Sequence, residues 1–274
     1  MIGLMASAAL AADEEMTWRE LDPANTVLMD LNDGLVVIEL NPLFAPHTVR
    51  QFKKLVQDRF YDGMPFYRVI DGFLAQGGDG SDLGEISNIP LIDAEFDIEW
   101  TADLPFVTVQ SPDMFAALTG FTDGFAVARD PKTGKAWLTH CPGIVAMARN
   151  DDPDSSRTDF YIVIGQAPRY LDRNLNVFGR VVFGMDVVQR IRRGPSLNDG
   201  IIPDETSSTR IGRLQLLSDI PEEDRLFSYV LDTNSEAFAD LLQDRRKRKQ
   251  RFFKNKPPRV LDICQVPVQG RITK

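Results

Sequence analysis

Residues 66–79 read FYRVIDGFLAQGGD and place one arginine and one glutamine among apolar residues. The β-rich runs around the central Asp-Gly pair predict a hairpin. A three-residue loop at 71–73 pairs Arg68 with Gln76 across the two strands and leaves Leu74 on the same face, whereas a two-residue loop scatters these side chains. Periodicity alone is equally compatible with a plain hairpin whose arginine extends its charged end into solvent.

Strand signals dominate the rest of the chain up to residue 219. Residues 26–31 and 35–40 are β-rich runs separated by Asn-Asp-Gly, which is a strong hairpin signal. From residue 46 to 60 the apolar residues recur every three to four positions, which predicts an amphipathic helix. Further predicted strands are 143–147, 160–164, 177–182 and 210–217, with a second helix at 184–191. The pattern predicts a mainly β fold.

The stretch at 66–79 resembles the signature of the cyclophilin family of peptidyl-prolyl cis-trans isomerases. A second set of blocks is similar to the family in order and spacing: GIVAMA at 143–148, FYI at 160–162, YLD at 170–172 and VFGRV at 177–181. The resemblance covers about residues 25–219. It implies the family fold, a cyclophilin-like eight-stranded antiparallel barrel capped by two helices.

The resemblance also implies which residues act on the substrate, the X-Pro bond of unfolded or loop segments of client proteins. Arg68 corresponds to the family's catalytic arginine, which donates a hydrogen bond to the prolyl nitrogen, and Phe73 and Gln76 join it. The expected substrate-binding residues are Leu74, Ala148, Arg149, Tyr161, Tyr170, Leu171 and Leu175. This chemistry needs no covalent intermediate, and we expect no cofactor and no metal ion.

Several of these positions depart from the best-known family members. In the apolar pocket, Leu74 stands where methionine is common, Tyr161 stands where phenylalanine is usual, and Leu175 stands in place of a histidine. Three further positions also differ: Arg149 stands where asparagine is usual, Asp159 stands where glutamine is usual, and Tyr170 stands in place of a tryptophan. The tyrosine at 170 argues against strong sensitivity to cyclosporin-type inhibitors. The alternative function is a catalytically weak cyclophilin-fold module that binds peptides or acts as a chaperone.

Two segments interrupt or follow the predicted catalytic domain at 24–219. The insertion at about 80–142 has no sustained periodicity, which predicts long loops with a few short strands. It either folds beside the cleft and restricts substrates or merely decorates the barrel, and the second reading is favoured. The C-terminal extension at 220–274 predicts a charge-rich helix from 222 to about 253, then a strand or extended arm at 260–268.

The charge distribution limits the partners. The formal net charge of −9 argues against nucleic acid. The basic character is local, because residues 245–259 hold nine Lys or Arg and no acidic residue. Such a run is more often a solvated helix face than a weak contact with an anionic surface, although both remain open.

The N-terminal run and the cysteines bear on the compartment. Residues 2–12 are small and apolar, too short to span a bilayer, and resemble the hydrophobic region of a secretory signal cleaved after Ala11, so 1–11 is a predicted signal-peptide remnant. No Lys or Arg precedes Arg19, which a typical signal would carry. We expect a periplasmic protein, with a cytoplasmic one as the alternative. Unpaired Cys141 and Cys264 are favoured over a disulfide.

Overall fold

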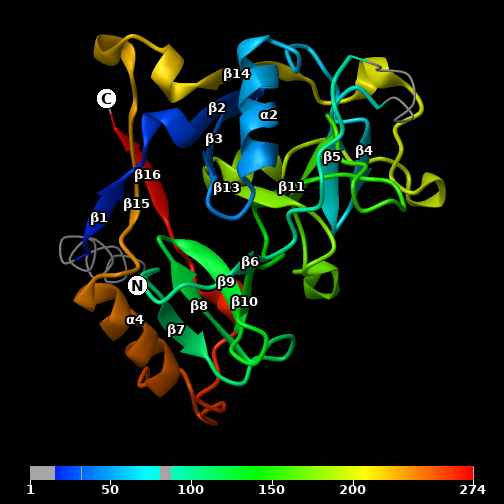
Figure 1. Ribbon diagram of the computed structural model, residues 1–274. Coiled ribbons are helices and arrows are strands. Elements are labelled where there is room, and N and C mark those ends of the chain that lie inside the picture. The colour runs from blue at the N-terminus through cyan, green and yellow to red at the C-terminus, as the bar shows by residue number, and fades with distance from the viewer. Residues whose placement is uncertain (1–15, 32, 81–87, 274) are drawn as a thin grey trace.

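The computed structural model describes residues 16–31, 33–80 and 88–273 (Figure 1). Its largest sheet has eight antiparallel strands in the order β14-β2-β3-β13-β11-β12-β5-β4. These strands are β2 (Thr26–Leu31), β3 (Gly34–Leu40), β4 (Arg68–Ile70), β5 (Leu74–Gly77), β11 (Ile144–Met147), β12 (Phe160–Val163), β13 (Val177–Phe183) and β14 (Ile211–Leu216). The predicted eight-stranded, mainly β architecture is confirmed.

The sheet curls until its two edge strands approach each other. Pro65, just before β4, forms a bridge with Arg210, just before β14. The Phe66 amide donates a hydrogen bond to the Thr209 carbonyl at 2.9 Å. These contacts join the edges of the sheet, so its inner face encloses an apolar core.

Two helices pack on this barrel. Helix α2 (Pro46–Gln57) buries Val49, Phe52, Leu55 and Val56, the apolar positions that predicted it. The Phe52 ring contacts the rings of Tyr61, Phe160 and Phe178, with centroids 4.8–5.6 Å apart. Helix α3 is shorter than the predicted 184–191 and spans only Met185–Val188. Truncating a buried ring such as Phe52 costs about 3–5 kcal/mol in cores of this kind.

The insertion forms a sheet of its own, which corrects the prediction of long loops with a few strands. Its order is β6-β10-β9-β8-β7. The strands are β6 (Ile98–Glu99), β7 (Val107–Gln110), β8 (Leu118–Thr122), β9 (Phe125–Asp130) and β10 (Lys135–Leu138). They are two to six residues long, too short for periodicity to be visible. One signal was present: Asp123 and Gly124, both at positive φ, form the two-residue turn between β8 and β9.

The C-terminal extension also differs from the prediction of one helix over 222–253. Strand β15 (Phe227–Leu231) pairs with β1 (Trp18–Glu20) and β16 (Gly270–Thr273), and helix α4 spans only Glu236–Lys247. The alternating burial of Ser228 and Val230 against exposed Phe227 is a strand pattern that the charged surroundings concealed. Figure 1 shows this small sheet and α4 on one side of the barrel.

A disulfide joins Cys141, just before β11, to Cys264 in the C-terminal arm, which we define as residues 260–268. The prediction that both cysteines are unpaired is therefore wrong. The two are 123 residues apart in the chain, and only the return of the arm to the barrel brings them together. The arm is extended with one short turn, Ile263–Gln265, in place of a regular strand.

The predicted signal-peptide remnant at 1–11 lies outside the described residues. Within the part of the chain that the structure describes, no helix is both long and apolar enough to cross a membrane.

Candidate active site

The hairpin β4–β5 places three predicted site residues in one row across the barrel wall. Arg68 is the cross-strand partner of Gln76, as the three-residue loop predicted. Gln76 is in turn the partner of Tyr161 on β12, and Tyr161 is the partner of Ala146 on β11. Because side chains on directly opposite residues share a face, the arginine, the glutamine and the tyrosine lie side by side.

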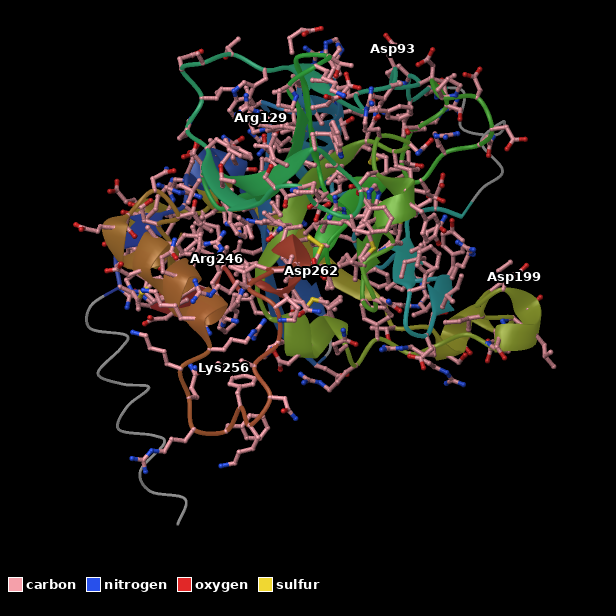
Figure 2. All side chains as sticks on the ribbon, turned by 90° about the horizontal axis from the view of Figure 1, so that it is seen from below. Asp93, Arg129, Asp199, Arg246, Lys256 and Asp262 are labelled. Carbon is pink, nitrogen blue, oxygen red and sulfur yellow. A yellow bond between two sulfur atoms is a disulfide. The ribbon has the colours of Figure 1, made fainter. Side chains whose placement is uncertain are left out.

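Two hydrogen bonds hold the Arg68 guanidinium. Its Nη1 donates to Oε1 of Gln76 at 3.1 Å, and its Nε donates to the Asp199 carbonyl at 3.1 Å. A guanidinium carries five N–H groups, and these bonds use two of them. The other three form no hydrogen bond with another described residue, and the Arg68 side chain is only half-buried. Figure 2 labels Asp199 on the loop beside β4.

Gln76 is held from its other end by Tyr67 and Asp159. Nε2 of Gln76 donates to the Tyr67 hydroxyl, and that hydroxyl donates to Oδ2 of Asp159 at 2.5 Å. The carboxylate therefore orients the hydroxyl, the hydroxyl oxygen receives the amide N–H, and the amide oxygen is left facing Arg68. A chain of polarised hydrogen bonds runs from Asp159 to the guanidinium.

The Asp159 carboxyl is buried beside a second acid. Burial, opposed in part by the Tyr67 hydrogen bond, and the nearby charge of Asp79 raise the pKa of Asp159 to about 6. Burial and the Asp159 charge likewise raise the pKa of Tyr67 well above its usual value. Gly78 leaves the room for this carboxyl: a Cβ there would lie 2.1 Å from Asp159 Oδ1.

The expected proline-binding residues gather around one apolar cluster. Leu74 and Tyr161 are buried in it, and Phe73, Ala148 and Leu175 pack against it half-buried. The insertion contributes to the same cluster through Phe121, Phe125, Val127, Ala136 and Leu138. The insertion therefore packs against the apolar cluster that holds Leu74 and Tyr161, and the restriction of substrates in the first of the two alternatives stays a prediction.

A buried histidine of the insertion fixes the floor of this cluster. His140 Nε2 lies 2.9 Å from the Tyr161 hydroxyl, and its Nδ1 lies 3.3 Å from Asp172 Oδ1. Although burial opposes ionisation, hydrogen bonds from His140 and Arg169 hold the pKa of Asp172 below its usual value. Tyr161 is only 3% exposed. The hydroxyl that distinguishes Tyr161 from phenylalanine is thus satisfied by the insertion.

The remaining predicted residues lie at the rim. Tyr170 is 68% exposed and Leu171 half-buried, both in the short turn Arg169–Leu171. The Arg149 side chain turns back to donate to the Asn174 carbonyl at 2.9 Å. Neither its amide N–H nor its carbonyl is hydrogen-bonded to another described residue, which leaves both for an extended peptide.

Sequence reasoning missed Tyr67, His140 and Asp172 as members of the site. Tyr67 lies just before β4 begins, so strand alternation did not place it beside Gln76. His140 lies at the end of an insertion without visible periodicity, and its contact with Tyr161 joins residues 21 apart. The tyrosine at 161 was the sequence signal that a polar residue such as His140 lies beside it, because a buried phenolic hydroxyl requires a polar partner.

The chain matches the family model of the cyclophilin type peptidyl-prolyl cis-trans isomerases over residues 26–211. It is 34% identical over 209 residues to a probable peptidyl-prolyl cis-trans isomerase of Brucella suis, covering 72% of this chain and 86% of the relative. Peptidyl-prolyl cis-trans isomerase-like 1 of Mus musculus is 29% identical over 182 residues, covering 66% and 86%.

A solved structure resembles nearly the whole chain. The cyclophilin AquaCyp293 from Hirschia baltica has a TM-score of 0.77 and 29% identity, covering 97% of this chain and 96% of its own. The match therefore extends over the insertion and the C-terminal extension. The barrel, the arginine-bearing hairpin and these matches agree: the chain belongs to the cyclophilin-type peptidyl-prolyl cis-trans isomerases, and it is an enzyme of that activity.

Proposed function

We propose that this chain accelerates the rotation of X-Pro bonds in client proteins by donating a hydrogen bond from Arg68 to the prolyl nitrogen. The observation that carries the proposal is the guanidinium held between Gln76 and the Asp199 carbonyl, with three N–H groups to spare, beside an apolar cluster. A positioned donor of this kind matches what the twisted amide requires.

The energetics of the amide explain why one donor suffices. An X-Pro bond rotates through a twisted state about 18–20 kcal/mol above the ground state, in tens of seconds or more. Twisting ends the resonance and leaves a lone pair on the prolyl nitrogen, so a fixed donor favours the twisted state over both planar isomers. Lowering the barrier by about 7 kcal/mol accelerates the rotation about 10⁵-fold.

The apolar cluster supplies the second requirement, a place for the proline ring. Phe73 and Leu171 are half-buried and present apolar surface, and Leu74 and Tyr161 are buried. Excluding water from the ring also strengthens the hydrogen bond from Arg68, because fewer competing water molecules remain. The free backbone groups of Arg149 align the peptide as an added strand.

Tyr67 and Asp159 act as positioning residues for Arg68. With the Asp159 carboxylate accepting the Tyr67 hydroxyl, the Gln76 amide has one favoured orientation, in which its oxygen faces the guanidinium. Loss of this orientation leaves Arg68 with the Asp199 carbonyl as its anchor and with a wider range of positions.

Replacing Tyr67 with phenylalanine is expected to lower kcat by about three- to tenfold for a tetrapeptide with one X-Pro bond, with little change in KM. The reason is that Gln76 loses the acceptor that fixes its amide. The matched control is Tyr61→Phe, because the buried Tyr61 hydroxyl donates to the Thr158 carbonyl and has no hydrogen bond to Gln76. Equal losses of kcat in both variants would assign Tyr67 a structural role only.

The Asp159→Asn variant tests the raised pKa through stability. A carboxyl whose folded pKa is raised stabilises the fold below its unfolded pKa, near 4, and loses this contribution as pH rises through about 6. Asp79, Tyr67 and Tyr61 surround the group and belong to the same charge environment. Urea unfolding is expected to show Asp159→Asn gaining stability relative to the unmodified protein between pH 4 and pH 8. A difference that does not vary with pH would contradict the account.

The second candidate function is a peptide-binding or chaperone module that turns over poorly. The observation that favours it is the covered floor of the cluster, where His140 and the insertion leave Tyr161 almost wholly buried. A shallower pocket holds the proline ring less firmly against Arg68.

The proposed function extends to a class of client proteins and to a cellular compartment. The substrates are proline-containing unfolded or loop segments of proteins that fold in the periplasm. Support for an oxidising compartment comes from the Cys141–Cys264 disulfide, because such bonds persist outside the reducing cytosol. A weak contact of residues 245–259 with an anionic surface remains a proposal; one of its arginines, Arg246, is engaged with the Val109 carbonyl.

The isomerisation rate of a tetrapeptide with one X-Pro bond tests the proposed activity. We expect substoichiometric amounts of the purified chain to accelerate cis-to-trans conversion, and we expect the acceleration to scale with enzyme concentration. A folded chain without acceleration would overturn the proposal.

A further inference from the structure

A cavity of about 730 Å³ lies between the insertion and the C-terminal extension. Its walls come from the β7–β8 loop, the end of α4 and the C-terminal arm. We call it the lateral groove, defined by Met114, Phe115, Gln166, Arg245, Arg248 and Val260. Figure 2 labels Arg246 and Asp262 where α4 and the arm meet.

The lateral groove adjoins the candidate active site at two points. Gln166 lies on the wall of the groove, and its backbone N–H donates to the Gly72 carbonyl in the loop of the β4–β5 hairpin at 3.2 Å. Met114 and Phe115 also line a second hollow together with Tyr170, a predicted substrate-binding residue at the rim. The hollow beside Tyr170 and the lateral groove share Met114 and Phe115, so a polypeptide that leaves the proline site past Tyr170 meets the wall of the groove.

The groove presents apolar side chains to solvent on both walls. Met114 on the β7–β8 loop is 87% exposed, and Val260 on the arm is 51% exposed. Phe115 is 49% exposed and packs its ring against the Arg169 guanidinium at 5.2 Å. Exposed apolar side chains gathered around a cavity are typical of a binding surface.

Two arginines give the groove its charge. Among the described residues neither Arg245 nor Arg248 forms an ion pair, and both line the cavity. Of the acids on the walls, Asp113 is paired with Arg169 at 3.1 Å. Asp262 accepts the Cys264 amide N–H at 2.9 Å within its own turn. The walls therefore carry three arginines, with Arg169 among them, against the two acids Asp113 and Asp262, and this excess of positive charge favours a carboxylate on a bound segment.

We propose that the lateral groove binds the part of a client polypeptide that continues from the X-Pro site, preferring apolar residues accompanied by an acidic one. This inference rests on the proposed isomerase function, since the client must also occupy the catalytic hairpin. The insertion and the extension thereby give this enzyme a second contact with long, unfolded clients that short peptides do not reach.

The test compares two peptides with the same X-Pro core. One is a tetrapeptide, and the other carries about eight further residues on each side, rich in Leu and Glu, which span up to about 26–29 Å when extended. We expect the long peptide to have a KM about fivefold lower than the tetrapeptide. Replacing its Glu residues with Lys is expected to remove most of that gain.

The variant Met114→Ser/Val260→Ser removes exposed apolar side chains from both walls. Its expected effect is a KM for the long peptide that rises to the tetrapeptide value, with no such change for the tetrapeptide. The matched control is Phe227→Ser, because Phe227 is 48% exposed on β15 and lines no part of the groove. Equal KM values for the two peptides, or equal effects of the variant on both, would overturn the proposal.

Two further readouts separate the possible failures. Fluorescence anisotropy of the labelled long peptide reports binding without turnover, so an inactive chain that still loses long-peptide affinity in Met114→Ser/Val260→Ser refutes the isomerase proposal alone. Light scattering at the assay concentration reports self-association. A dimer that dissociates in the same variant would show that a second copy occupies the groove, which contradicts the proposal.

Discussion

Replacing Arg68 with alanine is expected to lower kcat/KM for an X-Pro tetrapeptide by about 100-fold, in line with the loss of one preorganised donor at a developing charge. The alanine variant removes the donor to the prolyl nitrogen and leaves the Gln76 oxygen and the Asp199 carbonyl without their partner. Both of these acceptors are within reach of solvent, so the fold is expected to survive.

The control for this prediction is a second arginine in a surface ion pair. Arg190 is half exposed and pairs with Asp186 at 3.0 Å, so Arg190→Ala is expected to leave kcat/KM within about twofold. Arg68→Lys is informative as well, because lysine keeps the charge but cannot bridge Gln76 and Asp199 while donating to a substrate. A kcat/KM of Arg68→Ala equal to that of Arg190→Ala would remove Arg68 from the mechanism.

Removing the disulfide is expected to lower the free energy of unfolding. The Cys141→Ser/Cys264→Ser variant is expected to lose about 2–4 kcal/mol of unfolding free energy, because the bond closes a long loop in the unfolded chain. The cysteines lie 123 residues apart, and the bond holds the C-terminal arm against the loop between β10 and β11. Guanidinium chloride unfolding followed by fluorescence measures the loss.

Reduction provides the matched comparison for this variant. Dithiothreitol is expected to lower the unfolding midpoint of the unmodified protein to that of the double serine variant and to leave the variant itself unchanged. Unmodified protein whose midpoint is insensitive to the reductant would show that the bond does not constrain the unfolded chain.

The barrel was predictable because its signals are local. The Asn-Asp-Gly sequence predicts the β2–β3 hairpin, which the pairing of Leu31 with Gly34 confirms, and apolar spacing predicts α2. The pairing of Arg68 with Gln76 followed from one choice, the length of the loop at 71–73. In each case the residues that carry the information lie within about a dozen positions of one another, where turn chemistry and periodicity operate.

The insertion, the extension and the disulfide were not predictable in this way. Strand β15 pairs with β1, whose residues lie over 200 positions away, and neither strand shows its partner in its own sequence. Cys141 and Cys264 meet only because the arm returns to the barrel. Contacts of this kind depend on tertiary packing, which overrides local preference.

Some residues of the candidate site were likewise predictable from the sequence, and others were not. The residues to which the family resemblance assigns a role were placed in the site, whereas Tyr67, which lies in the same stretch without such a role, and His140 were not. Tyr67 reaches Gln76 from outside the strand, and His140 reaches Tyr161 from the loop that follows β10. The departures at 159 and 161 were visible in the sequence, but their partners required the structure.

Exchange NMR on a tetrapeptide with one X-Pro bond tests most directly whether the chain turns its substrate over. At substoichiometric enzyme, we expect exchange cross-peaks between the cis and trans forms of the peptide, and we expect their loss in Arg68→Ala. Chemical-shift changes that report binding to the folded enzyme, without any cis–trans exchange, would contradict the account and identify a peptide-binding module.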